Sequence, residues 1–393
     1  MAKFPHANLP GLTNNLLATD LSTTSVNQYN VRIDHMFGTH DNVFVRGSIF
    51  DANEFDPFGS GALNETLLPG FGYNLRTHTD NLSLSWSHIL GPTWINELRF
   101  GWMWVGGGQS SPNAGINFAG PAGLQGVTTN LLDTGYPQAS VTGFTTMGEP
   151  TQYVSRKDNN YEIYDNVIWH HGTHTLKFGV YYFHLDFEPV NANNARGLFQ
   201  FTGRYTGNAL GDFLLGAPNQ GQVGLGGRGA LLGRTNWIHT YIQDGWQILP
   251  DLKLDIGLRY EYNQNVTDVN NNMAVVNTLV PGGQFVIASN SQGQISPAMA
   301  PFLSNIPIPY ITSSQAGWDR SLLTGKPLRL SPRIGIAWSL PDQRTVIRSG
   351  FGIYSNQAAY SIIQSAALNL PFYFAKTVTN LGVATPTYNT ENI

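Results

Sequence analysis

The feature that most constrains the fold is an alternation of apolar and polar side chains every two residues. The clearest case is the segment Lys253–Asn263. One set of alternate positions is apolar and the other is mostly charged: Leu254, Ile256, Leu258, Tyr260 and Tyr262 against Asp255, Gly257, Arg259 and Glu261. Successive side chains of a β-strand point to opposite faces, so the segment predicts a strand with one apolar and one charged face.

The same alternation, cleaner in some segments than in others, predicts about ten strands. Most approach the about 9–11 residues that a tilted strand needs to cross a bilayer. In the seventh segment, Trp237 and Tyr241 oppose Ile238, Ile242 and Trp246, so its faces stay unassigned. The segments are Tyr29–Phe37, Asn42–Asp51, Asn81–His88, Trp94–Trp104, Asp158–His170, Thr175–Tyr182, Thr235–Ile248, Lys253–Asn263, Arg333–Ser339 and Thr345–Tyr354.

The connections between these segments are alternately short and long. The short ones are Gly38–Asp41, Leu90–Pro92, His171–Thr173, Leu249–Asp251 and Leu340–Gln343. The long ones are Ala52–Leu75, Val105–Arg156, Glu188–Arg234 and Gln264–Arg329. Short periplasmic turns and long extracellular loops are typical of outer-membrane barrels. The sequence therefore predicts an all-β chain that forms part of an antiparallel transmembrane β-barrel.

The tryptophans favour the same class. Trp86, Trp94, Trp169, Trp246 and Trp338 each lie within a few residues of a short turn, as in an interfacial aromatic girdle. Trp102, Trp104 and Trp237 fall at the opposite strand ends and are expected to form a second girdle. The alternative is a water-soluble β-protein with these rings in its core.

Composition excludes several other classes. The chain has 393 residues, of which 12% are charged, with a net charge of −4, and no basic run points to nucleic acid. It has no cysteine, which excludes disulfides and thiolate chemistry. No apolar run approaches the about 18 residues of a membrane-spanning helix. No catalytic set of side chains stands out, so we expect no enzyme activity and no cofactor.

The strand count also predicts where the chain ends lie. Residues 1–27 are expected to be an extracellular loop remnant, residues 28–355 a partial barrel, and residues 356–393 a truncated extracellular loop. Within the last part, Ala358–Leu370 has near-helical apolar spacing and predicts a short helix. Both ends of the chain would then lie outside the cell. In addition, residues 1–12 lack the features of a signal peptide. We therefore expect a barrel truncated at both ends.

Three segments resemble a known family: Tyr241–Tyr262 (YIQDGWQILPDLKLDIGLRYEY), Leu330–Tyr354 (LSPRIGIAWSLPDQRTVIRSGFGIY) and Thr206–Gly216 (TGNALGDFLLG). Together they are similar to the barrel of Oar-like TonB-dependent receptors, over roughly Asn27 to Tyr354. The resemblance implies a Gram-negative outer-membrane barrel of about 22 strands, with a plug domain and a periplasmic box that engages the TonB complex. The plug, the box and the remaining strands are absent from this sequence and would be its partners, together with outer-membrane lipid.

Ten charged residues fall on the face expected to point into the barrel. The lumen-facing candidates for solute contact are Arg32, Glu97, Arg99, Arg259, Glu261 and Arg348; Asp34, Lys253, Asp255 and Arg333 share their face. Charges there avoid lipid, where an arginine or lysine at the midplane costs about 2–4 kcal/mol. Opposite charges stand close together, so structural pairing is favoured over a substrate role.

Three other motifs are weaker. The cluster His170, His171 and His174 fits a turn better than a zinc site, because no local Cys, Asp or Glu joins it. Gly224–Gly229 (GLGGRG) matches the glycine spacing of a nucleotide-binding loop. Such a loop is followed by a helix, whereas the next periodic segment here predicts a strand, so we reject the match. Asn263–Asn272 is oxygen-rich but lacks the acidic density of a calcium loop, and we expect a flexible loop.

Two functions from different classes remain open. The chain would belong either to an outer-membrane transporter that imports an unidentified solute, or to a surface or adhesion protein whose long loops bind a partner without transport. A weaker third reading is a soluble secreted β-protein that binds glycans through its aromatic side chains.

Overall fold

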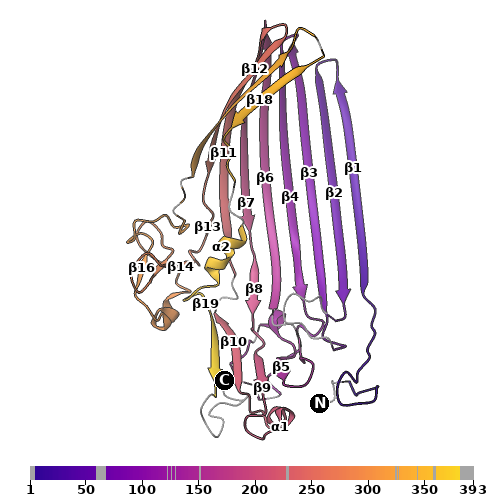
Figure 1. Cartoon of the computed structure of the whole chain (residues 1–393), viewed down its shortest axis with the longest axis vertical. Helices are drawn as coiled ribbons and strands as arrows, with labels where there is room; N and C mark the ends of the chain where they lie inside the picture. The colour runs from indigo at the N-terminus through magenta and orange to yellow at the C-terminus, as the bar shows by residue number, and fades with distance from the viewer. Residues whose placement is uncertain are drawn as a thin grey trace.

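The computed structural model describes residues 5–58, 68–121, 123–124, 126–128, 130–149, 152–226, 230–323, 325, 327–342, 344–356 and 360–380. Within these residues, one large antiparallel sheet runs along most of the molecule (Figure 1). The order of its ten main strands is β1 (Thr23–Phe37), β2 (Asp41–Asp56), β3 (Tyr73–Gly91), β4 (Trp94–Ser110), β6 (Gln152–His171), β7 (His174–Phe187), β11 (Gly233–Leu249), β12 (Leu252–Asn263), β17 (Leu328–Ser339) and β18 (Val346–Gly352). All ten strands that the alternation predicts are present, and each pairs with its neighbours in sequence order.

The short turns all lie at one end of this sheet and the long connections at the other (Figure 1). The hairpin between β6 and β7 is an example of how a short turn forms. Its Gly172 has a φ of 58°, in the left-handed region that glycine enters at little cost. Several strands are longer than the about 9–11 residues that cross a bilayer: β3 has 19 residues and β6 has 20. These strands therefore extend beyond the alternating segments toward the long connections.

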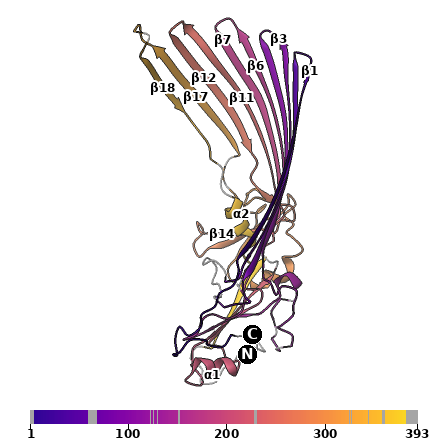
Figure 2. The same cartoon turned by 90° about the vertical axis from the view of Figure 1, so that its right-hand side faces the viewer.

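The sheet is curved and, within the described residues, open. β1 pairs only with β2 and β18 only with β17, so these two strands are its edges. Two short strands lengthen it at the loop end: β8 (Val190–Asn193) pairs with β6, and β13 (Thr267–Asp268) pairs with β11. Figure 2 shows the strands fanning out toward the short turns, and α2 and β14 lie to one side of the sheet.

The long connections are folded rather than loose. We call the described parts of residues 111–149, 188–232, 264–327 and 360–380 the loop cap. It contains a four-stranded sheet of β19 (Tyr373–Thr379), β10 (Gln220–Gly226), β9 (Leu198–Phe201) and β5 (Gln138–Val141), and a three-stranded sheet of β14 (Ala274–Asn277), β15 (Gln284–Ile287) and β16 (Tyr310–Thr312). Its helices are α1 (Ala209–Leu214) and α2 (Tyr360–Ala367), with 3-10 helices η1 (Leu131–Asp133) and η2 (Ala300–Asn305).

The buried core lies mainly in and under this cap. Phe183, Leu185 and Phe187 of β7 pack with cap residues that include Met273 and Ile363. A second cluster joins Phe71 to side chains of β5 and β9, and a third surrounds Ile287. Burying apolar surface stabilises by about 25 cal/mol per Å², so these clusters hold the long connections in one arrangement.

The predicted helix in the last connection is confirmed over Tyr360–Ala367; residues 358 and 359 of the predicted segment lie outside the described part. Ile363, Ala366 and Ala367 are buried against the cap and the adjoining end of β7. No helix in the described part of the chain is long and apolar enough to cross a membrane.

Candidate functional site

The strand register divides the large sheet into two faces of opposite character. Paired residues of an antiparallel sheet point to the same face, so one assigned strand fixes its neighbours. Leu258 of β12 pairs with Ile242 of β11 and with Pro332 of β17. Arg259 pairs with Tyr241 and Ser331 on the opposite face. We call these the apolar face and the charged face.

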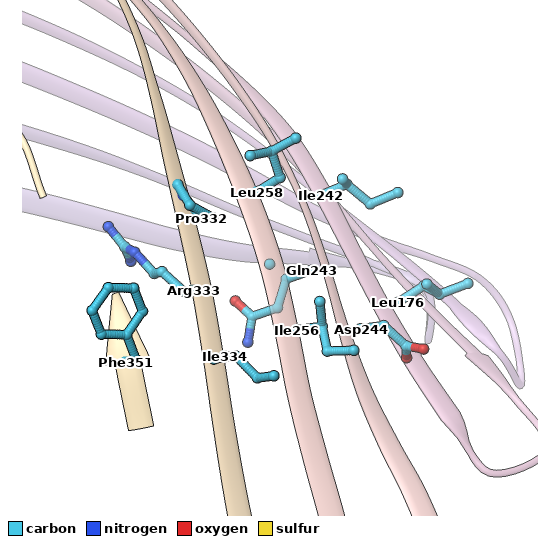
Figure 3. A pocket seen from close by; sticks show the side chains of 11 residues that line it. Leu176, Ile242, Gln243, Asp244, Ile256, Leu258, Pro332, Arg333, Ile334 and Phe351 are labelled. Carbon is cyan, nitrogen blue, oxygen red and sulfur yellow. The ribbon is translucent and has the colours of Figure 1, made fainter. Parts of the chain in front are cut away.

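This register also resolves the strand that the sequence left unassigned. In β11 the side chains of Ile238, Ile242 and Trp246 belong to the apolar face. Trp237, His239 and Tyr241 belong to the charged face. Ile242 and Gln243, which follow each other on this strand, point to opposite sides (Figure 3).

The apolar face presents its side chains to the surroundings over all ten main strands. Val31 and Ile33 in β1, Leu258 in β12 and Phe351 in β18 are all exposed. A shallow hollow of about 520 Å³ lies among Leu176, Ile242, Ile256, Leu258, Ile334 and Phe351 (Figure 3). Exposed apolar surface this extensive is not found on a soluble monomer, and it matches the lipid-facing band of a barrel.

The first tryptophan girdle is confirmed in position. Trp86, Trp94, Trp169, Trp246 and Trp338 all belong to the apolar face and lie near the short turns. Trp94 and Trp169 stack with ring centroids 4.9 Å apart. At the other strand ends, Trp102 and Trp104 share this face.

The prediction that Trp237 belongs to the second girdle is wrong. Trp237 pairs with Phe183 and points to the charged face, with the two rings 4.5 Å apart. Both rings contact the apolar cluster under the loop cap. At this height the charged face is covered by the cap, so an aromatic ring is partly buried there instead of meeting an interface.

All six candidate residues of the barrel interior lie on the charged face: Arg32, Glu97, Arg99, Arg259, Glu261 and Arg348. The four companions Asp34, Lys253, Asp255 and Arg333 lie there too. The loop cap packs against this same face, because Phe183 of its core pairs with Glu162 and Trp237. The charged face is therefore the side that the cap covers.

Most of these charges are paired along a single strand. Arg32 contacts Asp34 at 2.6 Å and Arg99 contacts Glu97 at 2.5 Å. Lys253 contacts Asp255 at 3.1 Å, and Arg259 contacts Glu261 at 2.8 Å. Residues two apart on a strand share a face, so each pair stands side by side on the wall. The pairing that the sequence favoured is present, although along strands and not across them.

Arg259 is the centre of the most connected group. One guanidinium nitrogen lies 2.6 Å from His239 Nδ1, and Nε donates to Glu261. The hydroxyl groups of Ser331 and Ser355 donate to the same carboxylate of Glu261. His239 Nε2 lies 2.7 Å from Asn263 Oδ1. These contacts join β11, β12, β17 and the segment after β18 into one polar network.

Aromatic side chains continue this wall onto β6 and β7. Tyr164 and Tyr181 stack with centroids 4.4 Å apart, and the Tyr164 hydroxyl donates to Glu162 at 2.8 Å. The Tyr241 ring lies over Gly179, and its hydroxyl donates to Asn166 at 2.9 Å. Hydroxyl, amide and guanidinium groups therefore follow one another along this face.

Sequence reasoning missed polar contacts on the apolar face. Asn96 donates to Asp165 at 2.5 Å, and His174 Nδ1 lies 2.6 Å from Asp244. Asp41 accepts from the Trp86 indole at 2.7 Å. The partners come from different strands, and only the register brings them together. A carboxylate at an apolar-face position of an alternating strand is the signal that marks such pairs.

The histidine cluster is divided between the two faces. His170 pairs with Thr175 on the charged face, whereas His171 and His174 are on the apolar face. Among the described residues, no group of three or more His, Cys, Asp or Glu side chains is arranged to hold a metal ion.

The expectation that Asn263–Asn272 is a flexible loop is wrong. β13 lies within it, and the buried Asp268 carboxylate accepts backbone N–H groups of Leu232, Asn270 and Asn272 at 2.7–2.8 Å. Burial raises the pKa of Asp268, and these three bonds oppose the shift. The glycine pattern 224–229 enters β10 as far as Gly226, and its residues 227–229 lie outside the described part.

A family model described as "Outer membrane beta barrel domain" matches residues 1–393. No curated protein matches the sequence. Similar solved structures include the outer membrane transporter YddB from Escherichia coli (11% identity, TM-score 0.47, 86% of this chain and 33% of that one). Others are FpvA of P. aeruginosa (12%, 0.41, 82% and 34%) and BauA, the ferric preacinetobactin receptor from Acinetobacter baumannii (10%, 0.38, 84% and 39%). The chain spans about a third of the length of these proteins.

Proposed function

Because this chain belongs to the outer membrane beta barrel domain family, we propose that it forms part of the wall of a TonB-dependent transporter that imports a solute. The protein lies in the outer membrane of a Gram-negative bacterium. The observation that carries the transport proposal is the contrast between the two faces of one sheet. The face opposite the exposed apolar band has a continuous polar network centred on Arg259, as a water-filled passage requires.

The open edges support a barrel larger than this sheet. β1 is exposed along all of its 15 residues and offers unpaired backbone groups. In hydrocarbon each unsatisfied backbone group costs several kcal/mol, so a membrane-spanning sheet has to be closed. We propose that strands outside this sheet pair with β1 and β18, and that a plug domain and the TonB complex act with the closed barrel.

A second candidate is a surface or adhesion protein, and the folded loop cap favours it. Three connections that are remote in sequence build the sheet of β5, β9, β10 and β19, which gives the cap a defined surface. A binding surface of this kind needs no passage through the sheet. In neither function does the chain act as a catalyst.

The two candidate functions predict different results when uptake of solutes is measured with and without TonB. A strain that lacks the gene for the full-length protein is complemented with it, in the presence and absence of TonB. Solutes remaining in a complex medium are then compared by mass spectrometry. Transport predicts that at least one solute is depleted only when both the protein and TonB are present. Adhesion predicts no such solute, together with surface binding that persists without TonB.

A further inference from the structure

One row of residues crosses five neighbouring strands on the charged face. The register pairs Lys177 of β7 with Gln243 of β11, Gln243 with Gly257 of β12, and Gly257 with Arg333 of β17. Arg333 in turn pairs with Gly352 of β18. Lys177 and Arg333 therefore lie on either side of Gly257, a position where no side chain projects from the charged face.

This part of the charged face has an excess of positive charge. From β7 to β18 it carries six lysines and arginines but two carboxylates: Lys177, Lys253, Arg259, Arg329, Arg333 and Arg348 against Asp255 and Glu261. The excess is four positive charges, in a chain whose net charge is −4. The sign of this surface is thus opposite to that of the whole molecule.

The two cations of the row differ from the paired ones beside them. Lys253 and Arg259 each have a carboxylate within 3.1 Å. Within the described residues, no carboxylate lies within ion-pair distance of Lys177 or Arg333, and Arg333 lies over the Tyr354 ring at 4.7 Å. Both side chains are exposed. A guanidinium and an ammonium group are therefore available to an anion from outside the chain.

The surface between them is hollow, with the Gln243 amide as a neutral hydrogen-bond donor and Arg259 as a further cation in its lining. A hollow of about 240 Å³ is lined by residues that include Lys177, Tyr241, Gln243, Ser331 and Arg333. A larger one of about 510 Å³ adjoins it over Gly257, Gly335, Gly350 and Gly352. A Cβ added at Gly257 would have no neighbour closer than 3.5 Å, and the nearest side chain is that of Gln243 at 3.6 Å, so the floor at Gly257 is open beside Gln243.

We propose that this row, from Lys177 to Arg333, is a binding site for a solute with at least two oxyanion groups, carboxylate or phosphate. The proposal rests on the proposed function, in which this face lines the passage. Arginine binds an oxyanion with two parallel N–H groups and lysine acts as a point charge, while the Gln243 amide offers a neutral N–H donor.

The spacing of the row sets the preference for more than one anionic group. Neighbouring strands lie about 4.8 Å apart, so the backbones of Lys177 and Arg333, three strands apart, are about 14 Å from each other. One small anion cannot contact both charged groups unless both side chains bend fully over Gly257. A solute with two anionic groups spans part of this distance, so the side chains need to bend less to contact it. We therefore expect citrate and pyrophosphate to bind more tightly than acetate and monophosphate.

The test is isothermal titration of the full-length protein refolded in detergent, with citrate, pyrophosphate, acetate and monophosphate as probes. The variants are Lys177→Gln, Arg333→Gln and the double change. Arg46→Gln is the matched control, because Arg46 pairs with Arg32 and so faces the same side, but from β2. It removes one positive charge from this wall far from the row.

Charge-assisted hydrogen bonds are strong enough that losing both cations should weaken citrate or pyrophosphate binding by at least about tenfold. The control should change it less than about twofold, since an exposed charge several strands away is screened. The effect should fall with added salt for the wild type. Circular dichroism of each variant checks that the sheet has formed.

Three results would overturn the proposal: no binding of either polyanion by the wild type, equal weakening by Arg46→Gln, or equal affinity for acetate and citrate. A preference between citrate and pyrophosphate would distinguish a carboxylate ligand from a phosphate one. The titration measures binding and does not depend on energised uptake. If uptake fails in cells, the binding site is not contradicted. If the polyanions do not bind, the transport proposal is not contradicted.

Discussion

At the scale of single residues, the two faces differ in what each position tolerates. Leu258 and Gly257 are neighbours in the middle of β12 and point to opposite faces. The Leu258 side chain is 44% exposed on the apolar face. In the full-length protein, Leu258→Arg should cost about 2–4 kcal/mol in the free energy of unfolding in lipid vesicles, because the charge would enter hydrocarbon.

Gly257→Arg is the matched change on the charged face. The new Cβ would meet nothing closer than 3.5 Å, and the guanidinium would point into water. Its unfolding free energy in the same vesicles should fall much less than that of Leu258→Arg. Equal losses at the two positions would contradict the assignment of the faces. A loss that is the same in detergent and in lipid would contradict the lipid contact.

Close packing on the charged face gives a second prediction at this scale. A Cβ on Gly179 would lie 2.6 Å from a Tyr241 ring carbon and 2.8 Å from the Asp165 backbone oxygen, which cannot move aside. Gly179→Ala should therefore lower the unfolding free energy by about 1–3 kcal/mol, the usual cost of overpacking.

Gly101→Ala provides the control, because its new Cβ would have its nearest neighbour at 3.8 Å. This change should be neutral or slightly stabilising, since alanine loses less backbone freedom than glycine on folding. Urea unfolding followed by tryptophan fluorescence measures both variants. If Gly179→Ala is as stable as Gly101→Ala, Tyr241 does not cross the wall at Gly179.

At the scale of elements, the strands were predictable and the loop cap was not. Alternation is a local property, so a segment such as Lys253–Asn263 reveals its strand without knowledge of its neighbours. The cap depends on pairings between distant segments: β5 runs parallel to β9, with Gln138 opposite Leu198. Its strands have two to seven residues, too few for a periodic pattern, and its order comes from nonlocal packing.

The same limit applies to the candidate site. Its charged residues could be assigned to one face from alternation alone, and that assignment is confirmed by the register. The contact of Arg259 with His239 could not be predicted, because the faces of β11 were ambiguous in the sequence. Trp237 was placed wrongly for a related reason, since the cap that buries it has no local signature.

A buried ion pair in the cap gives a prediction for pH. Glu149 is fully buried, with Arg196 Nε 3.6 Å from its carboxylate. Burial raises the pKa of the Glu149 carboxyl, and the Ser111 hydroxyl, Arg196 and Asn113 oppose this shift. A carboxyl with a raised pKa in the folded state stabilises the fold at low pH, and this contribution is lost as the pH rises through the raised value.

The wild-type cap should accordingly become more open to protease as the pH rises above the usual range for glutamic acid. In Glu149→Gln the side chain stays neutral at every pH, so the stability of the cap no longer depends on the ionisation of this residue. Leaving Arg196 buried without its carboxylate changes the stability by an amount that does not vary with pH. The rate of cap cleavage in the wild type, divided by the rate in Glu149→Gln at each pH, should therefore increase with pH. A flat ratio would mean that Glu149 does not change its ionisation in this range.

At the scale of the whole molecule, the segregation of short turns and long connections determines which parts reach each side of the membrane. The loop cap should face the outside of the cell and the turns the periplasm, as in outer-membrane barrels generally. This sequence has no cysteine, so an introduced thiol is the only one in this part of the protein, and the unsubstituted full-length protein gives the background labelling. Ser291 and Thr173 are suitable positions, because both are exposed, one in the cap and one in the β6–β7 turn.

In intact cells that express the full-length protein, a membrane-impermeant maleimide should label Ser291→Cys but not Thr173→Cys. Labelling of Thr173→Cys should appear once the outer membrane is permeabilised, and both variants should react equally in detergent, which controls for thiol reactivity. The opposite pattern in intact cells would invert the orientation of every strand. Labelling of both positions in intact cells would show that the sheet does not separate two compartments. In that case neither the apolar band nor the charged wall has the role that its side chains suggest, because both depend on one sheet that divides lipid from water.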